Sequence, residues 1–268
     1  LNNELVTKLI IPDSATSIGN YAFYNCASLE SITIPDSVTS IGAYAFSGCS
    51  SIESITLPFI GATKNGTENT HFGYVFGASS YSSNKDRVPS SLKTVEITGG
   101  TNIEENAFSG CTSLTSITIP SSVTSIGSSA FSGCTSLTSV YMTDLEAWCG
   151  IEFGNVPSNP LYYAHNLYLN NELVTKLVIP NGVTSIGDYA FYNCASLESI
   201  TVSSSATSIG SSAFNGCSSI ESATMPALAI DYIPQKNLKT VVITSGTSIG
   251  NYAFNDCTSL TSITIPDS

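Results

Sequence analysis

The sequence predicts an α/β solenoid, in which short units of strand, turn and loop stack into one elongated array with a parallel β-sheet along one side. Three observations lead to this prediction: a motif that recurs at a fixed spacing, an alternating apolar pattern after each copy, and an unusual composition. Hydrophobic residues make up 42 % of the 268-residue chain and charged residues only 10 %, against about 25 % in an average soluble domain. Ser, Thr, Asn and Gly must therefore cover the surface.

The recurring motif is Ala-Phe-x-x-Cys. Cys26 and Cys49 lie 23 residues apart, and two later pairs of copies repeat this spacing. Ser-Ile-Gly precedes most copies, and Leu-x-x-Ile-x-Ile-Pro follows most of them. A unit of this length cannot bury its apolar face alone, whereas a stack of units can. The motif begins at Ala22, Ala45, Ala107, Ala130, Ala190, Ala213 and Ala253.

The segment after each motif has the pattern of a short strand. In residues 29–35, Ile32 and Ile34 alternate with polar residues, so both should point into the core. Pro35 lacks an N–H group and therefore ends the strand. Aligning this pattern along the chain gives eleven strands, whose patterns begin at Val6, Leu29, Ile52, Leu92, Leu114, Leu137, Val174, Leu197, Ile220, Leu238 and Leu260.

The return leg of each unit leads back to the Ala-Phe motif through a turn. Val38 and Ile41 begin this leg, and a helical turn should then push Phe46 into the core. Gly42 allows a tight turn, but Glu104 fills the equivalent place in another unit, so a positive φ cannot be obligatory there.

Three segments depart from the regular spacing. Insertions occupy residues 59–90 and 143–172, and we expect a hairpin near residues 167–174. A shortened unit, residues 226–237, lacks the Ala-Phe motif. Residues 1–58 and 169–226 differ at only 14 of 58 positions, which indicates duplication of several units together.

The unit Leu-x-x-Ile-x-Ile-Pro-x-x-Val-x-x-Ile-Gly-x-x-Ala-Phe-x-x-Cys resembles the BspA-like leucine-rich repeats of bacterial surface proteins, over nearly the whole chain except the insertions. The resemblance implies a curved, right-handed solenoid of about eleven units, with the parallel sheet on the concave side and short helical turns and loops on the convex side. It also implies adhesion or host interaction without catalysis. Ala223 replaces the usual strand Ile, and Ser203 the usual Pro. We expect residues 1–268 to form one domain, cut from a larger protein.

Charge excludes several classes of partner. The formal net charge is −12, whereas binding of nucleic acid needs clustered Lys and Arg. The same charge argues against an anionic membrane surface. No stretch approaches the roughly 18 apolar residues of a membrane span. We therefore expect neither nucleic-acid binding nor membrane insertion, and we expect the isolated chain to be a monomer.

Seven of the eight cysteines occupy the same position in the repeat. Equivalent side chains in stacked units run parallel, with Cβ atoms near the roughly 4.8 Å strand spacing, whereas a disulfide needs about 3.8 Å and converging side chains. We therefore expect free, buried thiols. No Cys-x-x-Cys or histidine pair indicates a metal site, and no motif indicates a cofactor.

Cys149 lies outside this register. With His165 it is the one plausible pair of nucleophile and base in the second insertion. The simpler interpretation is that Leu145, Trp148 and Phe153 form a satellite core around it. No catalytic motif surrounds Cys149, so we expect a non-enzymatic protein.

The exposed strand positions are the better candidates for binding, and the glutamates stack into two pairs, Glu30 with Glu53 and Glu198 with Glu221. Adjacent like charges are unfavourable, so the pairs could attract a cationic partner or simply splay apart in water. The candidate residues of this face are Glu30, Thr33, Glu53, Thr56, Lys93, Glu96, Thr118, Tyr141, Glu198 and Glu221.

The first insertion is a second candidate, because loops held on a rigid scaffold often carry recognition. Tyr74, Phe76 and Tyr81 are its candidate contacts, although Val75-Phe76 also resembles a decayed Ala-Phe element and the loop could be a neutral scar of duplication. The function we predict is adhesion of a cell-surface or secreted protein to a protein or glycan. The alternative is a passive spacer that projects another module.

Overall fold

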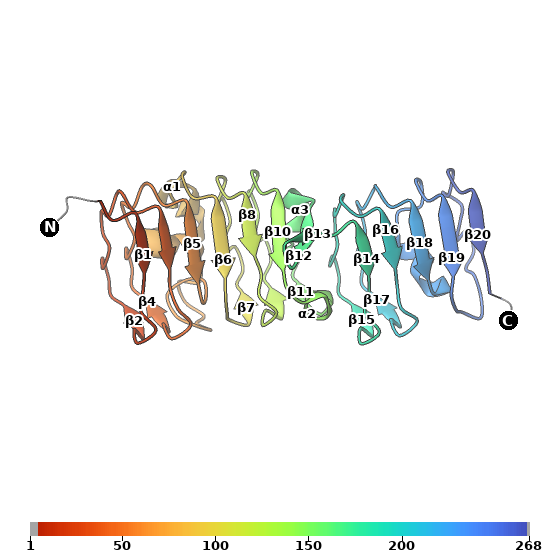
Figure 1. Cartoon of the computed structure of the whole chain (residues 1–268), viewed down its shortest axis with the longest axis horizontal. Helices are drawn as coiled ribbons and strands as arrows, with labels where there is room; N and C mark the ends of the chain where they lie inside the picture. Colours follow the sequence, from red (N-terminus) through yellow and green to blue (C-terminus); the bar gives the residue numbers. More distant parts are fainter. Residues whose placement is uncertain (1–4, 267–268) are drawn as a thin grey trace.

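The computed structural model describes residues 5–266, which form one elongated row of coils (Figure 1). The eleven predicted strands are all present, and they confirm the solenoid. Their bounds are β1 Lys8–Ile10, β3 Ser31–Thr33, β5 Ser54–Leu57, β6 Thr94–Ile97, β8 Ser116–Thr118, β10 Ser139–Met142, β14 Lys176–Val178, β16 Ser199–Thr201, β18 Ser222–Met225, β19 Thr240–Ile243 and β20 Ser262–Thr264.

The long strands form two sheets along the solenoid rather than one continuous sheet. A hairpin of β12 (Leu167–Leu169) and β13 (Glu172–Leu173) divides the strands into an eight-stranded sheet, β1-β3-β5-β6-β8-β10-β12-β13, and a five-stranded sheet, β14-β16-β18-β19-β20. Asn170 and Asn171 form the turn with φ angles of 51° and 68°. The turn makes β13 antiparallel to β12, and β14 starts only two residues after β13 ends. The sheets therefore separate at this point (Figure 1).

A second side of most coils carries a two-residue strand with an exposed or half-buried first residue and a buried second one. These strands pair in parallel, β2 with β4, β9 with both β7 and β11, and β15 with β17. Their bounds are β2 Ser17–Ile18, β4 Ser40–Ile41, β7 Asn102–Ile103, β9 Ser125–Ile126, β11 Glu152–Phe153, β15 Ser185–Ile186 and β17 Ser208–Ile209.

The third side is built from the Ala-Phe segments, and in the regular units these are successive hydrogen-bonded turns rather than the helical turns we predicted. Within residues 5–266, helices occur only in the two insertions and the shortened unit. They are the 3₁₀ helices η1 Phe72–Phe76, η2 Tyr81–Ser83, η3 Val156–Ser158 and η4 Ala227–Tyr232, and the α-helices α1 Asn84–Arg87, α2 Leu145–Cys149 and α3 Leu161–Ala164.

Neighbouring regular Ala-Phe turns are joined by a backbone hydrogen bond from the phenylalanine of the first turn. The Phe23 N–H donates to the Ala45 carbonyl at 2.8 Å, and the same bond recurs between later units. The phenylalanine rings stack beneath it, with 5.5 Å between the centroids of Phe23 and Phe46 and 5.2 Å between those of Phe191 and Phe214. The bond fixes the register of adjacent turns while the rings fill the core between them.

The repeated cysteines are buried in the interior units, as predicted, and all eight cysteines of the chain are free. The cysteine thiols also make hydrogen bonds that the sequence did not predict. The thiols of Cys49, Cys134 and Cys217 each lie 3.0–3.2 Å from the phenylalanine carbonyl of the preceding unit and donate to it. A small apolar group with a weak donor suits this position.

The repeated glycine is needed for close approach of the backbones, not for its φ angle. A Cβ at Gly42 would collide with the Asn20 nitrogen and lie 2.6 Å from the Gly19 carbonyl carbon. Positive φ falls two residues later, at Tyr44 and its equivalents. At Gly19, which has no such neighbour, a Cβ would meet nothing within 4 Å.

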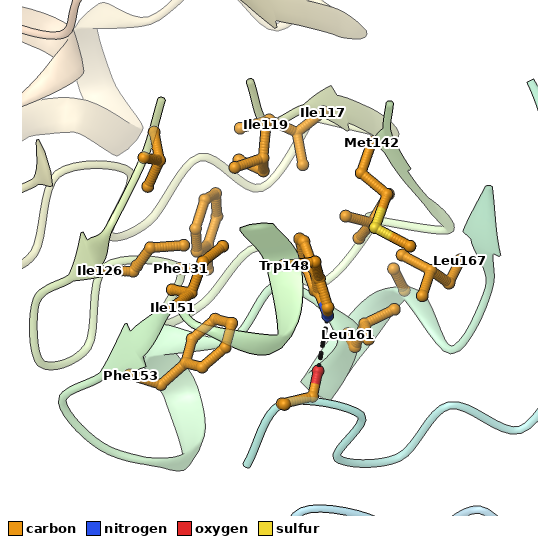
Figure 2. Close-up of a cluster of buried hydrophobic side chains, with 14 of the residues drawn as sticks. Ile117, Ile119, Ile126, Phe131, Met142, Trp148, Ile151, Phe153, Leu161 and Leu167 are labelled. Atoms are coloured by element: carbon orange, nitrogen blue, oxygen red, sulfur yellow. Dashed lines mark hydrogen bonds between the residues drawn. The ribbon is translucent and has the colours of Figure 1, made fainter. Parts of the chain in front are cut away.

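The second insertion continues the core with different residues. Trp148 on α2 is 1 % exposed and lies among Phe153, Ile151 and Leu161 (Figure 2). Trp148 and Phe153 are packed together as predicted, but they belong to the main core and do not form a satellite core. Its indole N–H donates to the Ala190 carbonyl at 2.9 Å. Trp148 thus links the first block of repeats to the second.

Buried amide side chains complete the Ala-Phe hydrogen bonds wherever a regular unit follows an irregular one. The Asn84 amide donates to the Ala107 carbonyl, the Asn159 amide to that of Ala190, and the Gln235 amide to that of Ala253, at 2.8–3.1 Å. Asn84 and Asn159 are fully buried. We call these three residues the amide caps.

Replacing Gly42 with Ala should destabilise the chain, because the new methyl group would press on the backbone of the preceding unit. We expect a cost of about 1–3 kcal/mol, typical of overpacking. The matched control is Gly19→Ala, where the same change meets open space and should leave stability within about 0.5 kcal/mol. Urea unfolding followed by circular dichroism measures both; equal midpoints for the two variants would contradict the close-approach argument.

Replacing Asn84 with Asp keeps the shape of the side chain but removes its two N–H donors. The ionised carboxylate would face the carbonyl oxygens of Ala107 and Ser109, so the folded state should hold its pKa above the unfolded value. Stability should therefore be nearest to the parent chain below about pH 4 and fall as pH rises through the folded pKa. Asn84→Ala, which should lose about 1–3 kcal/mol at all pH values, is the control. Thermal melting over a pH series measures the difference.

Candidate interaction surfaces

The outward positions of the long strands form one continuous row of neighbours, which we call the strand face. Thr33, Thr56, Glu96, Thr118 and Tyr141 are paired in this order across β3, β5, β6, β8 and β10. Within this row the Thr56 hydroxyl donates to the Glu96 carboxylate at 3.1 Å. The structure thus brings together five of the residues predicted from the sequence.

The glutamates lie at the start of these strands and are stacked as predicted. Glu30 and Glu53 are joined by a backbone hydrogen bond of 2.8 Å, and so are Glu198 and Glu221. All four side chains are exposed.

The second glutamate pair is partly neutralised. The ammonium group of Lys239 lies 2.7 Å from the Glu221 carboxylate. The equivalent lysine in the first block, Lys93, donates instead to the Ser90 carbonyl. The pair of Glu30 and Glu53 is therefore the more available of the two for a cationic partner.

The strand face carries a pair of stacked tyrosines, of which only Tyr141 was predicted from the sequence. Tyr168 on β12 stacks against Tyr141, with ring centroids 4.7 Å apart and planes 19° from parallel. Both tyrosines are half-buried, so the rings are supported from below and open above. In the sequence Tyr168 lies inside an insertion. It belongs to the strand face only because β12 continues the sheet, which the sequence did not indicate.

Beside this pair, the break between the two sheets leaves a cavity of about 300 Å³, which we call the apolar wedge after its aliphatic residues. These are Leu145, Leu169, Leu173 and Val178, and Glu172 and Lys176 also line the cavity. Leu173 is 43 % exposed and Val178 60 %. Because β14 pairs only with β16, the strand edge that faces the wedge has no neighbouring strand.

The first insertion contributes less surface than predicted. Phe76 is 1 % exposed and packs between Phe46 and Phe72, so it is a core residue and not a contact. The Val75 carbonyl accepts the bond from Phe46 that an alanine accepts elsewhere, which confirms the decayed Ala-Phe element. Tyr74 is half-buried, and Tyr81 on η2 is 47 % exposed.

Cys149 and His165 do not form a catalytic pair. Cys149 is fully buried in α2, and burial raises the pKa of its thiol to about 12. His165 is exposed, and its Nδ1 lies 3.2 Å from the Asn193 carbonyl. A buried thiol with a raised pKa is a poor nucleophile.

Residues 5–266 contain no cluster of three or more His, Cys, Asp or Glu side chains placed to hold a metal ion. None of the helices in this part of the chain has the length and apolar character needed to cross a membrane.

Comparison with known proteins shows the family. The model of the BspA type leucine rich repeat region matches six copies over residues 1–72, 88–149 and 164–268, and the chain belongs to this family. The unmatched segments lie within the two insertions. Repeats of this family form interaction domains that are typically non-enzymatic.

Solved structures of bacterial leucine-rich-repeat proteins are similar along almost the whole chain. A protein from Bacteroides ovatus is 25 % identical, covering 97 % of this chain and 81 % of its own, with a TM-score of 0.39. A leucine rich cell surface protein from Faecalibacterium prausnitzii is 24 % identical, covering 98 % and 88 %, with a TM-score of 0.35. A search of curated proteins gave no match.

Thiol accessibility tests the placement of the cysteines. Burial raises the pKa of Cys134 to about 12 and that of Cys194 to about 11, so these and the other buried thiols should resist an aromatic disulfide reagent at mildly alkaline pH. Exposed Cys26 should react at once and partly buried Cys257 more slowly. After denaturation all eight should react. A denatured count that falls short by pairs would mean disulfides and would overturn this assignment.

Proposed function

We propose that this chain is a non-catalytic adhesion domain of a cell-surface or secreted protein, and that it binds a protein ligand through the strand face. Membership of a repeat family of interaction domains supports the general role, and the cell-surface name of the Faecalibacterium prausnitzii protein supports the location. A feature of this chain itself favours the strand face.

The feature that favours the strand face is the cluster formed by the stacked Tyr141 and Tyr168 and the apolar wedge beside them. Binding energy at protein interfaces concentrates in a few aromatic and apolar anchors that sit in well-packed surroundings. Tyrosine is favourable because it offers a large rigid surface and a polar hydroxyl group. Exposed apolar residues gathered at one place, here Leu173 and Val178, are also typical of interaction sites.

Charge favours a basic partner. The carboxylates of Glu30 and Glu53 stand side by side on the same face, and Glu96 lies further along it. A chain with a net charge of −12 attracts cationic proteins over a long range and speeds their encounter. Tyr81 in the first insertion, with Lys85 and Arg87 of α1 close by in sequence, would offer a contact of opposite charge.

Removing the aromatic pair should weaken adhesion. We expect the double variant Tyr141→Ala/Tyr168→Ala to lose about tenfold or more in affinity, mainly through faster dissociation. Binding of the 268-residue chain to immobilised extracellular-matrix proteins and to epithelial cells measures it. Tyr252→Ala, which removes an 85 % exposed tyrosine elsewhere, is the matched control and should bind normally.

The charged residues should act differently from the tyrosines. The double variant Glu30→Gln/Glu53→Gln should slow association at low salt and lose that effect at high salt. Normal binding by the tyrosine variant would move the site away from this cluster. If the parent chain binds none of the matrix proteins and no cell, the passive spacer is the better function.

A further inference from the structure

A depression lies on the Ala-Phe side of the solenoid, where the shortened unit replaces a regular one. Residues 226–237 contain η4 in place of an Ala-Phe turn, so the turn of the preceding unit has no full-sized neighbour. The resulting hollow has a volume of about 360 Å³. Its walls include Ser212 and Asn215 from one unit and Asp231, Tyr232, Ile233 and Pro234 from the other.

The polar groups of this depression are not engaged by the protein. Nearby polar side chains hold units together: the Asp188 carboxylate accepts from the Ser211 N–H, the Asn193 amide donates to the Tyr162 carbonyl, and the Gln235 amide caps Ala253. In contrast, the side chains of Asp231 and Asn215 make no hydrogen bond within residues 5–266. Both are exposed at the rim of the hollow.

The depression also has an apolar component. Tyr232 is 39 % exposed, and buried Ile233 and the Pro234 ring lie beside it. Sites for small ligands commonly combine an apolar surface with a few converging polar groups, in clefts of about 300–1,000 Å³. A carboxylate, an amide and a hydroxyl around an aromatic ring suit a ligand that has an apolar face and a rim of hydroxyl groups.

We propose that this depression binds a neutral hexopyranose residue of a glycan. The C–H face of the sugar ring packs on Tyr232, while its hydroxyl groups donate to the Asp231 carboxylate and exchange hydrogen bonds with Asn215. The carboxylate disfavours anionic sugars. This site is separate from the strand face and does not depend on the function proposed above.

A longer glycan would leave the depression over a row of tyrosines. Tyr189 and Tyr192 lie one unit away, because the Tyr189 N–H donates to the Ser211 carbonyl and the Asn193 N–H to the Asn215 carbonyl. Tyr162 continues the row, with its ring centroid 6.1 Å from that of Tyr192. Further sugar rings can therefore stack along this side of the solenoid.

Saturation-transfer NMR on the 268-residue chain tests the site with the methyl glycosides of glucose, galactose, mannose and N-acetylglucosamine. We expect transfer to at least one of them, with at least fivefold weaker binding in Tyr232→Ala and threefold weaker binding in Asp231→Asn. Tyr252→Ala and Asp256→Asn remove similar exposed groups outside the depression and should bind like the parent chain. The absence of transfer to all four glycosides, or equal binding by the site and control variants, would overturn the proposal.

Two further measurements separate this site from the others. The strand-face variant Tyr141→Ala/Tyr168→Ala should keep its full glycoside signal, so failure of the glycan site and failure of the adhesion site are distinguishable. Tyr192→Ala should weaken binding of an oligosaccharide that ends in the preferred sugar at least threefold, but leave the methyl glycoside unaffected. Unchanged oligosaccharide binding would contradict the row of tyrosines as part of the site.

Discussion

The backbone hydrogen bond from a phenylalanine N–H to a carbonyl in the turn of the next unit is the constraint on which the rest of the solenoid depends. It holds adjacent turns close enough for the rings of Phe23 and Phe46 to stack and for the Cys49 thiol to reach the Phe23 carbonyl. The same closeness excludes a side chain at Gly42. One spacing between backbones therefore selects phenylalanine, cysteine and glycine at three positions of the repeat.

Irregular units are accommodated because other donors bond to the alanine carbonyl of the regular unit that follows. A buried carbonyl without a partner costs about 1–3 kcal/mol, so an insertion that merely displaced a phenylalanine would be unfavourable. Asn159 and Gln235 provide the missing donors to Ala190 and Ala253, and Trp148 adds a second donor to Ala190. Ala107 accepts from both the Phe72 N–H and the Asn84 amide. The insertions thus take part in the hydrogen bonds that join neighbouring units and are not loops attached to the outside of the array.

The strands could be predicted from the sequence because their cause is local. Alternation of Ile32 and Ile34 with polar residues, ended by Pro35, defines a strand whatever lies next to it. The amide caps could not be predicted, because Asn84 lies in the insertion and its partner Ala107 lies 23 residues later, in the next regular unit. Phe76 was misplaced for a related reason, since only the packing of Phe46 and Phe72 shows that its ring completes the core.

The contrast between regular and irregular units also indicates which surfaces are candidates for ligand binding. A regular repeat renews nearly the same surface every 23 residues, and the duplicated blocks even reproduce their rows of glutamate and lysine. A surface that occurs once needs a break in the pattern. The hairpin of β12 and β13 creates one such break beside Tyr141 and Tyr168, and the shortened unit creates another beside Tyr232. In both places a missing neighbour exposes groups that the regular stack would cover, so departures from the repeat create the two surfaces that we propose as binding sites.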